Sequence, residues 1–165
     1  EEMHKVLQIR AEKDFEYSTI NLETVFHEVT SHIGEKIKKS RIKIETDFQV
    51  QKLKYVRSHI ENAFLNLITN SIKYGKPGED PYLKISSHEE NGNIVLTFAD
   101  RGIGVNLDRH GDDIFGMYKR FHNHPEARGL GLYLTKKQLQ ALGSDITVKS
   151  SPNIGTTFFI TLNSK

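Results

Sequence analysis

Three polar residues, Asn66, Asn70 and Lys73, are spaced so that a single helix would place them side by side. In a helix spanning 57–74 they fall within an arc of about 60°, because each residue turns the helix by about 100°. Amide oxygens are hard ligands that suit Mg²⁺, and a neighbouring lysine supplies point charge for phosphate. The row therefore suits a magnesium-bound polyanion, although a solvated helix face would show the same residues.

A second group of residues follows the apolar run at 94–99, where Asp100 precedes Gly102 and Gly104. An aspartate at the end of a strand projects its carboxylate into a crevice, and glycines let the backbone approach a ligand closely. The carboxylate accepts hydrogen bonds, so it suits an exocyclic amine such as that of adenine. An ordinary Asx turn after a strand would give the same short sequence.

A second pair of glycines, Gly129 and Gly131, stands where a helix is expected to begin. The free N–H groups and the positive dipole end of such a helix suit phosphate. The sequence lacks the GxxxxGK[ST] pattern of a P-loop, and no GxGxxG segment follows a strand. A plain glycine-rich helix start is the alternative interpretation.

Periodicity and turn signals predict the elements that position these residues. Helices are expected at 22–39 with Asn21 as N-cap, at 57–74 along a stripe from Ile60 to Ile72, and from Leu130 to Leu142 before Gly143. Strands are expected at 41–48, 82–86, 94–99, 145–150 and 156–162, and Asn91-Gly92 predicts a hairpin turn. Residues 101–128 form a long loop with about one helical turn. Hairpins with helices on one sheet face predict a two-layer α+β sandwich with about three helices.

Composition narrows the class of protein. The 165 residues include 23 Lys and Arg against 21 Asp and Glu, and the basic residues are scattered, which disfavours nucleic-acid binding. The absence of cysteine excludes disulfides and thiolate metal sites. No apolar run approaches the length that spans a bilayer, so no membrane contact is expected of this chain. A start at Glu1 suggests a piece of a longer protein.

Taken together in their order, the motifs resemble those of sensor histidine kinases. NLITNSIKY (66–74) is similar to the N box, DRGIG (100–104) and RGLGL (128–132) to the two glycine boxes, FGMYKRF (115–121) to the F box, and GTTF (155–158) to the closing motif. The match spans about 20–162. The catalytic and ATP-binding domain of that family has the Bergerat (GHKL) fold, a mixed, mostly antiparallel sheet backed by helices, which agrees with the predicted sandwich.

The resemblance implies a role for each matched position. Asn70 would coordinate the Mg²⁺ that bridges the ATP phosphates with assistance from Asn66, and Lys73 would contact phosphate. Tyr74 would line the nucleotide pocket and Asp100 would bind the adenine amine. The other implied nucleotide contacts are Gly102, Ile103, Gly104, Lys119, Arg120, Phe121, Arg128, Gly129, Leu130, Gly131, Leu132 and Thr157.

Two departures from the family pattern bear on function. Ala127-Arg128 stands where the second glycine box has a further glycine and a small residue, so Arg128 donates to phosphate or alters closure of the lid. Related topoisomerases and the heat-shock chaperone carry a water-activating Glu where this chain has Asn66. An amide cannot act as a general base, so Asn66 argues against efficient hydrolysis and for holding ATP until an acceptor arrives.

The family's phosphoacceptor histidine is not evident. His27-Glu28 is similar to the His-Glu pair of that site, but no proline follows closely. Because His27 lies on the polar side of its helix, a surface histidine is expected. Residues 1–17 are interpreted as the end of a dimerization and phosphoacceptor helix, residues 18–165 as the catalytic domain and 105–128 as its ATP lid. The resemblance implies a cytoplasmic domain, monomeric or weakly dimeric in isolation, that cannot phosphorylate itself.

The leading hypothesis is therefore an ATP-binding catalytic domain that transfers the γ-phosphoryl group of Mg·ATP to a histidine. Its partners would be the phosphoacceptor hairpin of the parent kinase and, downstream, a response regulator. Two alternatives stay open: an ATPase or serine kinase of the same fold, and a degenerate nucleotide-binding regulatory module, for which Arg128 is the only support.

Overall fold

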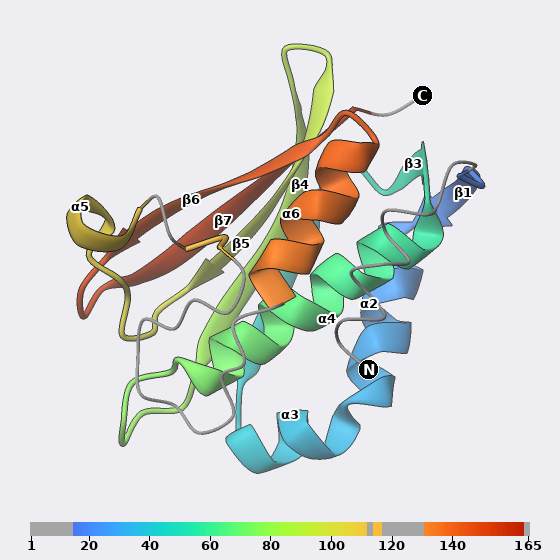
Figure 1. Ribbon diagram of the computed structural model, residues 1–165. Helices are drawn as coiled ribbons and strands as arrows, with labels where there is room; N and C mark the ends of the chain where they lie inside the picture. Colours follow the sequence, from blue (N-terminus) through green and yellow to red (C-terminus); the bar gives the residue numbers. More distant parts are fainter. Residues whose placement is uncertain (1–14, 112–113, 117–130, 164–165) are drawn as a thin grey trace.

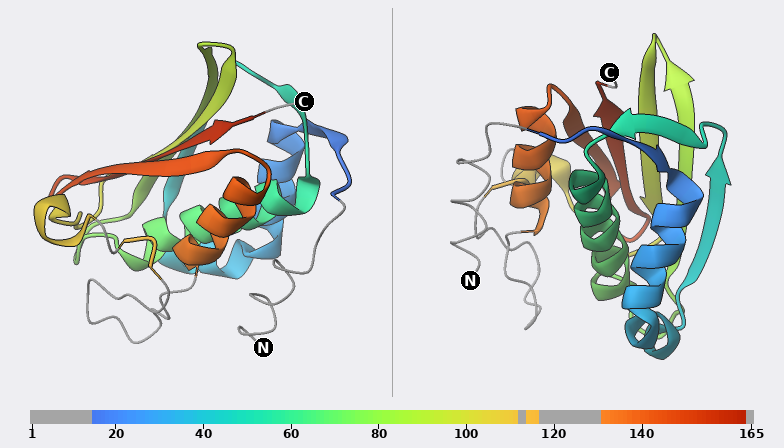
Figure 2. Two further views of the ribbon diagram at one scale, coloured as in Figure 1. Left: turned by 45° about the horizontal axis from the view of Figure 1, so that its top comes forward. Right: turned by 90° about the vertical axis from the view of Figure 1, so that its right-hand side faces the viewer.

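Two layers make up the protein, a five-stranded sheet and a layer of helices on one of its faces (Figures 1 and 2). The computed structural model describes residues 15–111, 114–116 and 131–163. The helices that cover the sheet are α2 (Leu22–His32), α4 (Arg57–Lys73) and α6 (Gly131–Ala141). The predicted two-layer α+β sandwich is confirmed.

The sheet has the strand order β2-β4-β5-β7-β6. Its members are β2 (Lys43–Phe48), β4 (Tyr82–Glu90), β5 (Asn93–Asp100), β6 (Asp145–Ser151) and β7 (Gly155–Leu162). The β2–β4 pair is parallel and the other pairs are antiparallel, so the sheet is mixed. This order places β5 and β7 side by side at the centre, and their paired ends bring Asp100 next to the start of β7.

The β4–β5 hairpin turns at the predicted dipeptide. Asn91 has φ 51° and Gly92 has φ 80°. A two-residue turn with two positive φ angles has the twist that matches paired strands, and asparagine and glycine tolerate it best. The turn sets the register in which Leu83 faces Asp100.

Helix α4 lies between α2 and α6 and buries one face against the core. Its buried residues repeat at helical spacing and are His59, Ile60, Ala63, Phe64, Leu67, Ile68 and Ser71. Phe64 meets Phe98 of β5 edge to face, with ring centroids 5.2 Å apart. Asn66, Asn70 and Lys73 lie half-buried beside this stripe, at the margin that the sequence predicts.

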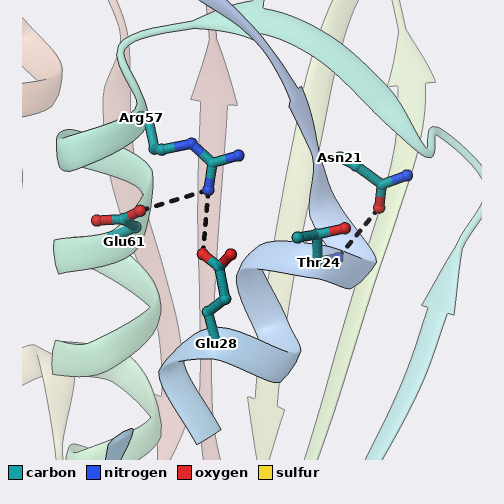
Figure 3. Close-up of polar contacts among 5 residues, drawn as sticks. All are labelled: Asn21, Thr24, Glu28, Arg57 and Glu61. Atoms are coloured by element: carbon teal, nitrogen blue, oxygen red, sulfur yellow. Dashed lines mark hydrogen bonds and ion pairs between the residues drawn. The ribbon is translucent and has the colours of Figure 1, made fainter. Parts of the chain in front are cut away.

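The predicted helix at 22–39 is two helices, α2 and α3 (Gly34–Ser40), because the backbone at Ile33 leaves helical geometry at φ −107°. Asn21 caps α2 as expected: its side-chain oxygen accepts from the N–H of Thr24 at 3.1 Å (Figure 3). Arg57 of α4 forms ion pairs with Glu28 of α2 and with Glu61 one turn further along α4. His27 is exposed and pairs with Glu23, which confirms the expected surface histidine.

The end of α6 is a Schellman motif. Gly143 has φ 76°, and its N–H donates to the carbonyl of Gln140. The N–H of Ser144 donates to the carbonyl of Leu139. These two bonds satisfy carbonyls that the helix leaves open, which is the role predicted for the glycine.

A second, two-stranded ribbon of β1 (Ser18–Asn21) and β3 (Lys52–Tyr55) has no counterpart in the sequence prediction. Residues 15–17, predicted within a helix tail, contain no helix. Phe15 instead packs edge to face on His59, and Tyr17 packs on Tyr55. Residues 1–14 lie outside the described part. Within the described residues, no helix is both long and apolar enough to cross a bilayer.

Candidate functional site

Asp100 lies at the end of the central strand β5, and one of its carboxylate oxygens is held by backbone. Its Oδ1 accepts from the N–H of Gly102 at 2.9 Å and from the N–H of Thr156 at 3.0 Å. Burial raises the pKa of this carboxyl, and the two backbone hydrogen bonds oppose that rise. Within the described residues no group donates to Oδ2, so this oxygen remains able to accept from a ligand.

The first glycine turn lies against the end of α4. The N–H of Ile103 donates to the carbonyl of Tyr74 at 2.9 Å. A Cβ atom at Gly102 would come within 2.3 Å of that same carbonyl oxygen, a distance no side chain tolerates. Glycine at position 102 therefore allows β5 and α4 to converge, which brings Asp100 toward the helix that carries the asparagines.

The same turn is also fixed from the other side, by the β6–β7 turn. Gly104 has φ 67°, and a Cβ there would stand 2.0 Å from the carbonyl oxygen of Ser151. The N–H of Asn153 donates to the carbonyl of Ile103 at 2.7 Å. Residues 102–104 are thus held between two elements, which explains why glycines flank Ile103.

Asn66 joins α4 to the beginning of α6. Its Nδ2 donates to the carbonyl of Gly131 at 3.2 Å and to Oγ1 of Thr135 at 2.9 Å. Thr135 is buried, and its hydroxyl also donates to the carbonyl of Gly131 at 2.9 Å. The amide nitrogen is thereby engaged, and Oδ1 is the atom of Asn66 left to act as an acceptor or ligand.

Asn70 lies one turn further along α4, on the same side as Asn66 and half-buried. Its side-chain amide makes no hydrogen bond within the described part of the chain, while its backbone carbonyl accepts from the N–H of Tyr74. Lys73 and Tyr74 follow at the end of the helix and are also half-buried. The predicted polar row and the first glycine turn therefore meet at the C-terminal end of α4.

The remaining predicted contacts divide into two groups. Gly131 and Leu132 begin α6, where Gly131 faces Asn66 and Leu132 packs partly buried against the core. The predictions for Lys119, Arg120, Phe121, Arg128, Gly129 and Leu130 fall outside the described residues.

Thr156 contacts Asp100, whereas the closing motif of the sequence predicts Thr157 as the nucleotide contact. The backbone of Thr156 binds Asp100 directly. Along β7, Phe158, Ile160 and Leu162 are buried toward the helices, and strand alternation puts Thr156 on their face and Thr157 on the other. The alternation of apolar residues after Gly155 is the signal that distinguishes the two threonines.

The chemistry of these groups fits a magnesium-bound adenine nucleotide. Oδ2 of Asp100 offers an acceptor to an exocyclic amine, and the side-chain oxygens of Asn66 and Asn70 are the hard ligands that Mg²⁺ takes alongside water and phosphate. The residues that would hold the base come from β5 and β7, and those that would hold the metal and phosphates come from α4. The acceptor and ligand atoms of the described residues therefore fit the base and the metal of Mg·ATP.

Comparison with known families agrees with this fold. Residues 55–165 match the family described as histidine kinase-, DNA gyrase B-, and HSP90-like ATPase, which covers more than half of the chain. The chain belongs to this family of ATPase domains.

Among curated relatives, the sensor protein RprX of Bacteroides fragilis is 35% identical over 107 residues, which are 63% of this chain and 21% of RprX. The histidine protein kinase SaeS of Staphylococcus aureus is 24% identical over 99% of this chain and 48% of its own length. The chain thus spans about a fifth to a half of these relatives. The histidine kinase ThkA, solved in complex with the response regulator TrrA, has a TM-score of 0.76 at 21% identity, over 98% of this chain and 46% of ThkA, and so shares its fold.

Proposed function

We propose that this chain is the catalytic domain of a sensor histidine kinase, which binds Mg·ATP and presents its γ-phosphoryl group to a histidine supplied by another part of the protein. Membership of the ATPase family and similarity to RprX and SaeS support this proposal. Residues 1–14 would be the end of the preceding phosphoacceptor helix, and residues 105–128 would form the ATP lid.

The observation that carries the proposal is the state of Asp100. Asp100 is partly buried, both of its backbone hydrogen bonds are made by Oδ1, and within the described residues Oδ2 has no donor. A carboxylate oxygen that is not used within the described residues can accept a hydrogen bond from the amine of a bound base. For a member of a family of ATPase domains, we assign this donor to the exocyclic amine of the adenine of ATP.

Asn70 is the residue we assign to Mg²⁺, with Asn66 assisting through Oδ1 and Lys73 contacting phosphate. The metal would neutralise charge on the phosphates, and the chain's own contribution is to hold base and phosphates in a fixed relation. Gly131 and the residues that precede it would meet the phosphates at the start of α6.

The chemistry of Asn66 favours transfer of the γ-phosphoryl group over hydrolysis of ATP. An amide nitrogen that donates to Gly131 and Thr135 has no basicity with which to activate water. ATP would therefore persist until an acceptor histidine enters. A response regulator would receive the phosphoryl group next, a proposal that the ThkA–TrrA complex supports by analogy of fold.

The decisive test is incubation of the chain with labelled Mg·ATP and a candidate phosphoacceptor hairpin, followed by acid treatment of the product. The proposal predicts acid-labile label on the hairpin and none on the chain alone. Acid-stable label would indicate a serine kinase, release of phosphate without labelling would indicate an ATPase, and nucleotide binding without either would indicate a regulatory module. Each of these results would overturn the histidine kinase proposal.

A further inference from the structure

Phe115, the first residue of the segment similar to the F box, contacts both layers of the protein. Its ring meets that of Phe158 in β7 edge to face, with ring centroids 6.2 Å apart. Nζ of Lys136, in α6, lies over the same ring at 4.6 Å from its centroid. Ile114, the preceding residue, is buried. Phe115 is therefore held between a strand of the sheet and a helix that covers it.

The ammonium group of Lys136 is fixed in this position by β6. Nζ donates to the carbonyl of Ile146 at 3.2 Å and forms an ion pair with Oδ1 of Asp145 at 3.1 Å. The lysine side chain is 27% exposed, so it is largely shielded from water. A cation within about 6 Å of a ring centroid is attracted by the negative face of the ring, and shielding from water strengthens the attraction. Lys136 therefore stabilises Phe115 at its place on α6.

The place of Phe115 in the chain connects this contact to the proposed nucleotide site. Lys119 and Arg120, which the sequence predicts as nucleotide contacts, follow Phe115 after four and five positions. The segment that contains them continues to Gly131, the first residue of α6 and a contact of Asn66. Fixing a residue close to a segment reduces the number of conformations that the segment can adopt, so less entropy is lost when a ligand orders it.

We propose that Lys136 is a positioning residue that anchors Phe115 to α6 through its charge, and thereby strengthens binding of the phosphates of ATP by the segment that follows Phe115. This inference rests on the proposed function, in which residues 105–128 form the ATP lid. Lys136 acts through Phe115 and does not itself contact the nucleotide. The contribution concerns the phosphates, because the basic side chains of Lys119 and Arg120 suit phosphate, whereas Asp100 is assigned to the base.

Titration of the chain with Mg·ATP and with adenosine tests the proposal, because adenosine carries the base without phosphates. Lys136→Met keeps the apolar stem and removes the charge, so the affinity for Mg·ATP should fall about two- to fivefold, the value of one cation–π contact, while the affinity for adenosine stays unchanged. Lys136→Arg keeps the cation and should restore the affinity. Lys137→Met is the matched control: Lys137 is the next residue of α6, its Nζ lies 5.7 Å from the ring centroid of Tyr133, and its loss should change neither affinity.

Replacing the ring itself separates positioning from a general loss of structure. Phe115→Leu keeps an apolar side chain and removes the ring, so it should lower the affinity for Mg·ATP alone, and adding Lys136→Met to it should cause no further loss. If Lys136→Met does not fold, Phe115→Leu decides by the same comparison of Mg·ATP with adenosine.

Three results overturn the inference while ATP binding by the parent chain keeps the proposed function. They are an unchanged affinity for Mg·ATP in folded Lys136→Met or in Phe115→Leu, an equal loss of affinity for Mg·ATP and adenosine, and losses that simply add in the double variant. Absence of saturable ATP binding by the parent chain removes both the inference and the proposed function.

Discussion

The N–H of Ile103 donates to the carbonyl oxygen of Tyr74 at 2.9 Å, which joins the turn after β5 to the end of α4. The two residues are 29 positions apart in sequence. This bond fixes the position of β5, which carries Asp100, relative to α4, which carries Asn66 and Asn70. The geometry of the candidate site depends on that junction.

Gly102→Ala tests the junction. The added Cβ would meet the carbonyl of Tyr74 at 2.3 Å, so β5 and α4 must separate. We expect a loss of about 1–3 kcal/mol in the free energy of unfolding and a weaker affinity for Mg·ATP. Gly34→Ala is the matched control, since a Cβ at Gly34 meets nothing within 4 Å. Denaturant unfolding measures both, and equal stabilities of the two variants would contradict the expected clash.

Asn66→Asp tests the connection of α4 to α6. The carboxylate cannot donate, so the bonds to Gly131 and Thr135 are lost and an acceptor faces the carbonyl of Gly131. The expected destabilisation is about 1–3 kcal/mol. Asn62→Asp makes the same change one turn earlier, where the amide is exposed and its bond to Gln138 is 3.5 Å long. A loss of similar size at both positions in thermal unfolding would show that charge alone, and not the bonds to Gly131 and Thr135, is responsible.

Asn70→Ala tests the metal ligand. The side-chain amide of Asn70 makes no hydrogen bond among the described residues, so its removal should leave the melting temperature nearly unchanged. The affinity for ATP in the presence of Mg²⁺ should fall at least about tenfold, the equivalent of 1.4 kcal/mol, and phosphotransfer to an added hairpin should stop. Calorimetric titration with and without Mg²⁺ separates the two effects, with Asn62→Ala as control. Unchanged phosphotransfer would remove Asn70 from this role.

The raised pKa of Asp100 predicts how ATP affinity and stability depend on pH. Because burial raises its pKa above the ordinary value, the carboxyl takes up its proton at a higher pH than an aspartate with the ordinary pKa. The protonated group is a poorer acceptor, so ATP affinity should fall as pH drops through the raised pKa. The stability of the chain changes in the opposite sense: ionisation is penalised in the folded state, so stability is lost as pH rises through that pKa.

Asp100→Asn should abolish the pH step in ATP affinity and reduce the preference for ATP over GTP, since its amide offers a donor beside the base. Titrations of both nucleotides across the acid range measure these effects. A pH step that persists in Asp100→Asn would assign the titration to a different group.

The sequence predicts most of the fold because its strongest signals are local. The apolar stripe of α4, the Asn91-Gly92 turn and the glycine that ends α6 each follow from a few neighbouring residues. The missed ribbon has four-residue strands, too short for alternation to be distinctive. The break at Ile33 interrupts a run of apolar residues that continues at helical spacing, so periodicity alone predicts one helix.

The sequence motifs predict several residues of the candidate site but not the contacts among them. Motif order identified Asn66, Asn70 and Asp100, but the partner of Asn66 lies 69 positions away at Thr135, and only tertiary structure brings the two together.

The central claim is that side chains of α4, the carboxylate of Asp100 and the start of β7 bind one Mg·ATP. Titrating the isotope-labelled chain with Mg·ATP, while following the backbone amides of Gly102 and Thr156 and the side-chain amides of Asn66 and Asn70 by NMR, tests it most directly. The account predicts that all four signals shift and saturate with one dissociation constant. Shifts that saturate separately, or that leave either pair unmoved, would contradict it.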